Sequence, residues 1–250
     1  MISYFSNFNS LEQALIAGLF TFSITTLGAA LVLFCKKINK LFLDSMLAIS
    51  AGIMIASSFF SLLNPAIELS NSWLVISLSF LLGGTLLLIC DYLLNLLCQN
   101  HDASNLKISL MLFISITLHN IPEGLMLGVA YGSNNLIGAL SLTLGIAIQN
   151  FPEGSAISFP LRRDGISKFK SFLFGSLSAI VEPIFAVIGA FLVLKTQSIL
   201  PAIMSLTAGA MIFVTVRELI PESFKNKRKS LMALFLMTGF TLMMILEIAL

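Results

Sequence analysis

The residues best suited to chemistry lie in two short segments that repeat each other thirty positions apart. The first reads HNIPEG over residues 119–124, and the second reads QNFPEG over residues 149–154. On a helix, His119 and Glu123 are four residues apart and share one face, while Asn120 is turned by about 100° toward a neighbouring helix. Imidazole, carboxylate and amide oxygen atoms gathered in one place suit a divalent cation such as zinc, cadmium, iron, manganese or copper.

The ligand types indicate a site that releases its ion. A structural zinc site uses four tightly bound Cys or His side chains, whereas here one imidazole is combined with oxygen ligands. Each motif also contains a proline, Pro122 or Pro152, which cannot donate its backbone hydrogen bond and frees a carbonyl group beside the polar residues. Glu182 followed by Pro183 repeats this combination of an acid with a proline further along the chain.

The composition places these motifs in a membrane. Of the 250 residues, 57% are hydrophobic and 10% are charged, against roughly 45–50% and 25% in a typical soluble domain. A helical span needs about 20 apolar residues. Eight such windows are predicted, which leave no room for a soluble catalytic domain: 12–34, 41–66, 73–97, 108–131, 136–161, 171–194, 199–221 and 231–250. We therefore predict an all-α polytopic membrane protein whose residues 1–250 form one integral membrane domain.

Several carboxylates fall deep within the predicted spans. A charged side chain at the bilayer centre costs about 2.5–3.5 kcal/mol on insertion scales, so acids at mid-depth indicate a function or a set of partners. Glu123, Glu153 and Glu182 are the acids that cannot easily reach an interface. Glu218 lies beside Arg217 near the end of the seventh span, and the sequence does not assign a role to this pair.

The basic residues favour one orientation. Of the 14 Lys and Arg residues, twelve lie in or beside alternate connections. These are Lys36, Lys37, Lys40, Lys107, Arg162, Arg163, Lys168, Lys170, Lys225, Lys227, Arg228 and Lys229. The opposite side carries only Lys195. By the positive-inside rule the basic connections face the cytoplasm and both termini face outward, as expected of a multi-pass protein of the plasma (inner) membrane.

Two internal repeats indicate an inverted architecture. The motifs at 119–124 and 149–154 lie in adjacent spans, which run antiparallel, so this repeat is inverted. Residues 50–55 of the second span (SAGIMI) also resemble residues 207–212 of the seventh span (TAGAMI), and an offset of five spans again reverses the direction. The predicted plan is three helices, a central pair and three helices, as in many secondary transporters.

With these motifs, the sequence resembles the Zrt-/Irt-like (ZIP) metal transporters along essentially its whole length, and the segments at 51–54, 208–211 and 220–222 resemble the GufA-type branch in particular. The resemblance implies eight helices in a 3+2+3 arrangement and metal import toward the cytoplasm, with zinc as the expected ion. It also implies a binuclear site between helices four, five and six. The first metal would be held by His119, Glu123 and Glu153, and Gln149 would line the site. The second would be held by Asn120, Asn150, Glu153 and Glu182, with Glu153 bridging the two metals.

This chain departs from the family pattern at two points. Many relatives carry His or Asp on helix five, where this chain has Gln149 and Asn150, so the site has less negative charge. The long histidine-rich connection between helices three and four is also absent.

Two other functions remain open from the sequence. One is a proton-coupled secondary transporter of a non-metal substrate, which would tolerate loss of His119. The other is an intramembrane metal-dependent hydrolase. The chain lacks a His-Glu-x-x-His motif, which argues against this function. We expect no enzyme activity and no bound cofactor. The expected partners are divalent metal ions and the lipid bilayer, not nucleic acid, and a homodimer is compatible with the sequence.

Overall fold

The computed structural model describes residues 5, 7–34, 39–70, 72–99, 105–133, 135–163, 165–195 and 197–249. Within these ranges the regular structure is helical throughout, which confirms the predicted all-α class. In chain order the helices are α2 (Ser10–Phe34), α3 (Lys40–Ser57), η1 (Ser58–Leu63), α4 (Asn64–Leu69), α5 (Trp73–Gln99), α6 (Asn105–Gly132), α7 (Leu136–Arg163), α8 (Lys168–Leu177), η2 (Ser178–Ile180), α9 (Val181–Lys195), η3 (Gln197–Ile199), α10 (Leu200–Val214), η4 (Thr215–Leu219), α11 (Ile220–Ser223) and α12 (Lys229–Ala249).

These helices coincide with the predicted spans, with ends that differ by no more than three residues. Six stretches in the described part of the chain are long and apolar enough to cross a membrane: 10–34, 40–69, 73–90, 168–195, 200–223 and 229–249. The other two long helices, α6 and α7, have 28 residues each and carry the two polar motifs. Both continue as helix through Pro122 and Pro152.

Two π-helical departures from regular α-helix lie where the sequence predicts uninterrupted spans, and a short 3₁₀ turn, η2, interrupts the sixth span. A π-helical turn, η1, follows α3, and a second, η4, follows α10. Each is followed by a proline, Pro65 or Pro221. Since proline has no N–H group to donate, it interrupts the regular hydrogen-bond ladder of the turn before it. The two π-helical turns begin 157 positions apart, the same offset that separates the similar segments at 50–55 and 207–212.

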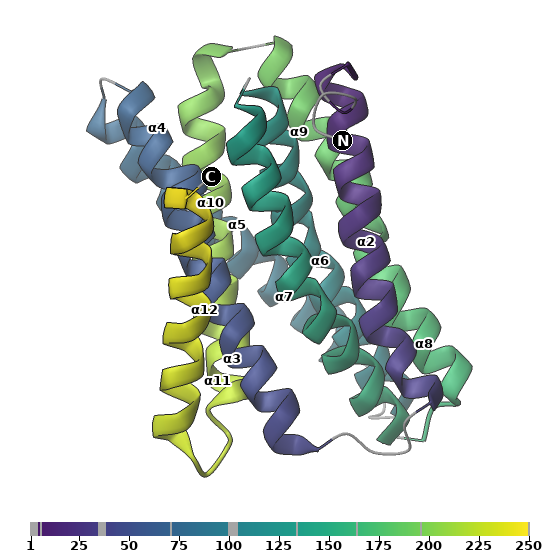
Figure 1. Ribbon diagram of the computed structural model, residues 1–250. Helices are drawn as coiled ribbons and strands as arrows, with labels where there is room; N and C mark the ends of the chain where they lie inside the picture. The colour runs from purple at the N-terminus through teal and green to yellow at the C-terminus, as the bar shows by residue number, and fades with distance from the viewer. Residues whose placement is uncertain are drawn as a thin grey trace.

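The helices pack into two groups (Figure 1). In the first bundle, α2 packs against α7, α8 and α9, and α6 packs against α9. In the second bundle, α3 packs against α12, and α10 packs against α5. The two bundles meet mainly where α3 contacts α7 and α10 contacts α6. The two motifs therefore belong to one bundle and lie on the helices that face the other.

Close backbone packing holds each bundle together. A Cβ atom at Gly154 on α7 would lie 2.0 Å from the Thr25 carbonyl oxygen on α2. In the second bundle, a Cβ atom at Gly209 on α10 would lie 1.9 Å from the Phe80 carbonyl oxygen on α5. Only glycine permits helices to approach so closely, and small residues at helix contacts are typical of membrane bundles.

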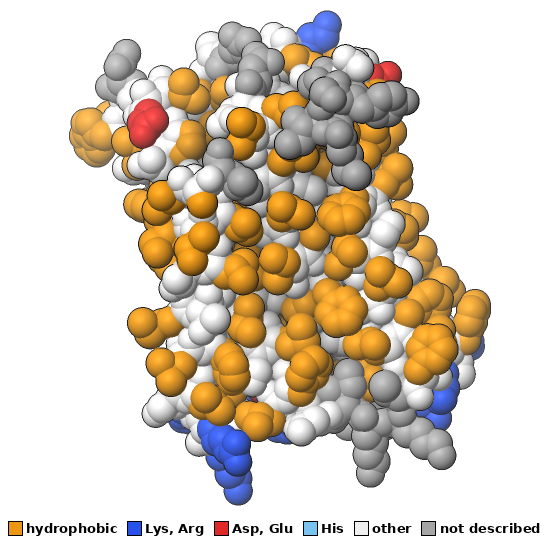
Figure 2. All heavy atoms as spheres, viewed as in Figure 1, with side chains coloured by type: hydrophobic (Ala, Val, Ile, Leu, Met, Phe, Trp, Pro, Cys, Tyr) orange, Lys and Arg blue, Asp and Glu red, His pale blue; other side chains and the backbone are white. Residues whose placement is uncertain are grey.

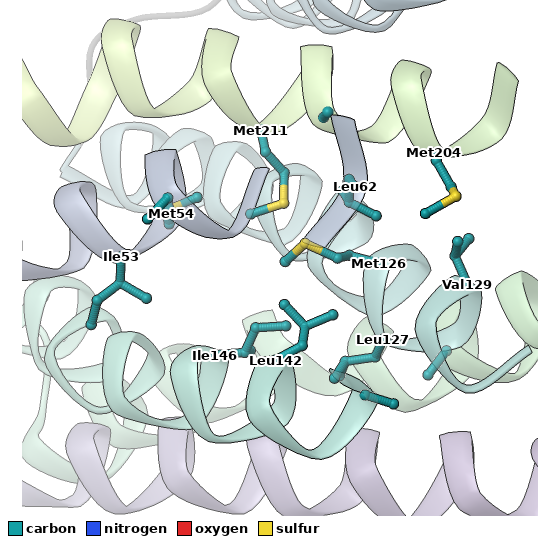
Figure 3. Close-up of a cluster of buried hydrophobic side chains, with 14 of the residues drawn as sticks. Ile53, Met54, Leu62, Met126, Leu127, Val129, Leu142, Ile146, Met204 and Met211 are labelled. Carbon is teal, nitrogen blue, oxygen red and sulfur yellow. The ribbon is translucent and has the colours of Figure 1, made fainter. Parts of the chain in front are cut away.

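Long apolar side chains fill the boundary between the bundles, as Figure 3 shows. Met54, Leu62 and Met211 come from the second bundle, and Met126 and Ile146 come from the first. Methionine is unbranched and polarizable and adapts to irregular gaps. Side chains therefore fill the boundary between the bundles, whereas glycines bring backbones into contact at points within each bundle.

The surface fits a bilayer environment. Hydrophobic side chains cover the middle of the face seen in Figure 2, and basic side chains gather mainly at one end. The two chain ends lie toward the other end in Figure 1. Trp73, Phe34 and Ile248 are each at least three-quarters exposed, which is expected where lipid replaces water as the solvent.

Candidate metal centre

The polar residues of the two motifs are buried together inside the first bundle. Of the seven residues predicted as ligands, six have described side chains, and each of the six is more than nine-tenths buried: Asn120, Glu123, Gln149, Asn150, Glu153 and Glu182. His119 lies in α6, one turn before Glu123, but its side chain lies outside the described part of the structure.

The glycine that ends each motif explains how these groups meet. A Cβ atom at Gly124 would lie 2.5 Å from the Glu182 carbonyl oxygen, so this glycine lets α6 pack directly against the start of α9. Gly154 does the same for α7 and α2 at Thr25. The Pro-Glu-Gly sequence therefore places a carboxylate next to a point of backbone contact with a neighbouring helix.

One amide of the second motif binds a carboxylate of the first. The Gln149 Nε2 atom donates a hydrogen bond of 2.6 Å to Glu123 Oε1. Since a carboxamide presents its oxygen on the side opposite to its NH₂ group, Gln149 Oε1 points away from this bond, and it is buried without a hydrogen-bond partner. This links α7 to α6 directly at the predicted first metal position.

The other amide binds Glu182. Asn150 Nδ2 lies 3.0 Å from Glu182 Oε1 and 2.9 Å from Oε2, so the NH₂ group faces both oxygen atoms of the carboxylate. The hydroxyl groups of Thr21 and Thr25 on α2 are also within hydrogen-bonding reach of this carboxylate. Both threonines are essentially inaccessible to solvent. Glu182 therefore accepts hydrogen bonds from α7 and lies close to the hydroxyl groups of α2.

Buried polar atoms without hydrogen-bond partners are concentrated at this centre. They include both side-chain polar atoms of Asn120, together with Gln149 Oε1, Asn150 Oδ1 and Glu153 Oε1. Leaving such atoms unpaired costs about 1–3 kcal/mol each, and native proteins contain few of them. Most of the five are oxygen atoms, which are suitable ligands for a hard or borderline divalent cation.

The carboxylates interact electrostatically across the centre. The charge of Glu153 is repelled by those of Glu123 and Glu182, and also by Glu218 from η4 of the second bundle. Glu218 is half-buried, so this acid, to which the sequence assigns no role, lies near enough to the centre to influence it. Among the residues with described side chains, no group of three or more His, Cys, Asp or Glu side chains is arranged to hold a metal ion. The amides of Gln149 and Asn150 are inserted between the acids.

Sequence reasoning missed the two threonines. Thr21 and Thr25 are four residues apart, so they share a face of α2, but threonine is common in membrane helices and bonds to its own backbone, as both do here. Only the packing of α2 against α9 shows that this face meets Glu182. No feature of the first span in isolation predicts that contact.

Comparisons with known proteins agree with the geometry. A family model described as ZIP zinc transporter matches residues 99–247. The chain is 31% identical to zinc transporter ZIP11 of Bos taurus, over 96% of this chain and 97% of the relative. It is 34% identical to zinc transporter ZIPB of Bordetella bronchiseptica, over 95% and 81%, and 30% identical to zinc transporter GufA of Myxococcus xanthus, over 94% and 98%.

Proposed function

We propose, because this chain belongs to the ZIP zinc transporter family, that it carries zinc across the membrane through the centre between α6, α7 and α9. The observation that supports this most directly is the set of buried oxygen atoms without partners, contributed by Gln149, Asn150 and Glu153. The family is one of transporters, as the sequence predicted, and it is not a family of enzymes. We also propose that residues 1–250 act as a single transport unit.

The metal centre has two adjoining positions that share Glu153. In the first, the ion is held by Glu123, Glu153, Gln149 Oε1 and His119, the last assigned from its spacing on α6. The second position lies toward Asn120, Asn150 and Glu182. An imidazole and oxygen ligands bind zinc less tightly than the four Cys or His ligands of a structural site, so the ion can leave again. The same ligands accept cadmium, iron, manganese or copper.

The apolar cluster of Figure 3 supports a path between the two bundles. On α6 the cluster residues Met126 and Leu127 follow the centre, and on α7 Leu142 and Ile146 precede it. Because the two helices are antiparallel, the cluster closes the centre on the side toward the chain ends. We propose that zinc enters there when these side chains separate, and that it leaves toward the end of the molecule where the basic connections lie.

The packing partners support eight spans in an inverted repeat. The repeat relates four pairs of helices: α2 and α9, α3 and α10, α5 and α12, and α6 and α7. When the members of each pair are exchanged, the contact of α2 with α7 becomes that of α9 with α6. The same exchange turns the contact of α3 with α12 into that of α10 with α5. The positive-inside rule then gives cytoplasmic basic connections and outward termini. We propose that the protein lies in the plasma (inner) membrane in this orientation and imports zinc.

Zinc uptake into proteoliposomes tests the function. Purified full-length protein is reconstituted around a zinc-sensitive dye, and we expect His119→Ala to abolish uptake while the protein remains folded. The matched control is His101→Ala, since His101 is the chain's other histidine and lies outside both motifs. Unchanged uptake in His119→Ala over a range of zinc concentrations would favour proton-coupled transport of a non-metal substrate instead.

Cysteine labelling tests the orientation separately. In a background where Cys35, Cys90 and Cys98 are replaced by serine, Lys227→Cys should react with an impermeant reagent only from the cytoplasmic side. Ser198→Cys, which follows α9, should react only from outside. The reverse pattern of labelling would overturn the orientation and the import direction together.

A further inference from the structure

We propose that the Asn150 amide and the Glu182 carboxylate form a closed pair that takes the place of a second metal ion, so that the centre holds one zinc ion. This inference rests on the proposed zinc-binding function and deepens it. It replaces the binuclear centre implied by the family resemblance with a mononuclear one in this chain. Glu182 then acts as a positioning residue for Asn150 and is not itself a zinc ligand.

The hydrogen bonds around Glu182 leave it little capacity for a metal. Its two carboxylate oxygens both accept from Asn150 Nδ2, at 3.0 and 2.9 Å. Thr21 and Thr25 on α2 lie close to this carboxylate, although their hydroxyl hydrogens are donated to backbone carbonyls. A zinc ion at this position would have to displace the amide NH₂ group, which faces both oxygens of Glu182, whereas Gln149 Nε2 donates to one oxygen of Glu123. The pair is fully buried, so water cannot compensate for the hydrogen bonds that would be lost.

The hydrogen bonds between Asn150 and Glu182 also fix the direction of the Asn150 amide oxygen. Because Nδ2 faces Glu182, Asn150 Oδ1 must point to the opposite side, where it is buried without a hydrogen-bond partner. The oxygen is therefore the atom of this amide that can bind a cation. Glu182, although not a ligand, keeps Asn150 from turning its NH₂ group toward the bound ion.

The charges of the centre also match one divalent ion. Glu123 and Glu153 supply two negative charges to the first position, which one Zn²⁺ neutralises. The third charge, on Glu182, is stabilised by the Asn150 amide without a cation. A second Zn²⁺ would bring two positive charges against this single remaining carboxylate, inside a region of low dielectric constant where uncompensated charge is costly. An aspartate at position 150 would change this balance by adding a carboxylate and removing the donors.

Zinc stoichiometry tests the pair. Equilibrium dialysis of the purified full-length protein in detergent with Zn²⁺ should give one ion per wild-type chain and two per Asn150→Asp chain. We expect the second ion to bind at least tenfold more tightly in Asn150→Asp than in wild type. The double variant Asn150→Asp/Glu182→Gln should return to one ion. The matched control is Asn64→Asp, the same amide-to-acid change in an exposed amide–carboxylate pair with Glu68 on α4, outside the centre, which should keep one ion.

The possible zinc stoichiometries distinguish a failure of this inference from a failure of the proposed function. Two zinc ions of comparable affinity in wild type, a single ion in Asn150→Asp, or two ions in Asn64→Asp would overturn the inference. A wild-type chain that binds no zinc would contradict the proposed function as well. If Asn150→Asp does not fold, crystals of the wild-type protein grown with excess zinc decide the question. One anomalous peak with Asn150 Nδ2 still bound to Glu182 supports the pair, and two peaks refute it.

Discussion

The two bundles differ in how they treat buried polar groups. In the second bundle, buried hydroxyls donate to backbone carbonyls: Ser57 and Ser58 donate to the Met54 carbonyl, and Thr215 donates to the Met211 carbonyl. In the first bundle, acids and amides from three helices bind one another and leave oxygen atoms without partners. The second bundle is thus built for stability, whereas the first accepts a cost in free energy that a bound cation offsets.

The largest effect on zinc binding is expected when a single carboxylate of the first bundle is replaced. Glu153→Gln removes a negative charge from the proposed zinc position, and we expect zinc affinity to fall by on the order of 100-fold or more, since changes to groups that only orient a metal ligand already cost about 10–100-fold. Uptake into proteoliposomes should be lost. The matched control is Glu247→Gln on α12, a carboxylate that accepts a hydrogen bond from Ser61 within the second bundle.

Glu247→Gln should retain most of the zinc uptake, because its partner hydroxyl can still donate to the amide oxygen. Equal loss of uptake in both variants would show that any buried acid is needed. The functional distinction between the two bundles would then be wrong.

Two glycine-to-alanine substitutions compare a glycine that packs against backbone with a glycine that packs against a side chain. In Gly154→Ala the new Cβ would meet the Thr25 carbonyl at 2.0 Å, inside the first bundle. In Gly145→Ala it would meet Met243 Sδ at 2.4 Å, at the boundary between the bundles. Backbone cannot yield, so Gly154→Ala should lower the free energy of unfolding by about 1–3 kcal/mol or more. The flexible methionine can turn aside, so Gly145→Ala should cost under about 1 kcal/mol.

Thermal unfolding in detergent, followed by circular dichroism, measures both glycine variants. A melting temperature that falls equally in the two would mean that the boundary is as rigid as the interior of a bundle. A larger fall in Gly145→Ala would reverse our description of the two kinds of contact.

A smaller effect is expected at the basic end of the second bundle. Asp44 is 4% exposed and accepts a hydrogen bond of 2.8 Å from Asn226 Nδ2, which ties the connection before α12 to α3. Asn226→Ala removes a donor from a buried carboxylate and should lower the free energy of unfolding by about 1–3 kcal/mol. Zinc affinity at the centre should not change. A changed affinity would show that this end of the second bundle is coupled to the centre.

The smallest effect is expected at an exposed ion pair in the same connection. Lys225 Nζ lies 2.5 Å from Glu222 Oε2, but both side chains are more than half exposed. Such pairs contribute about 0–1 kcal/mol, so Lys225→Ala should shift the melting temperature little. A shift as large as that of Asn226→Ala would show that this connection depends on its charges more than on the buried Asp44 contact.

The sequence by itself determined the positions of the long helices, because a bilayer demands long apolar helices and the chain offers few interruptions. It also determined the resemblance to the ZIP family, which the comparisons confirm, since acids at mid-membrane are too costly to occur by chance in two matching motifs. The positions of Glu123 and Glu153 on adjacent helices follow from the same spacing. Local chemistry and periodicity are sufficient for these inferences.

Only the tertiary structure decided which polar groups face one another. The spacing of Asn150 and Glu182 does not reveal that the NH₂ group of one faces the carboxylate of the other, because they lie on different helices and their distance depends on how α7 and α9 pack. The contributions of Thr21 and Thr25 arise in the same way. The π-helical turns were also hidden, since a proline indicates an interruption but not its form. Side-chain orientation across helices is set by packing, and packing is a property of the whole chain.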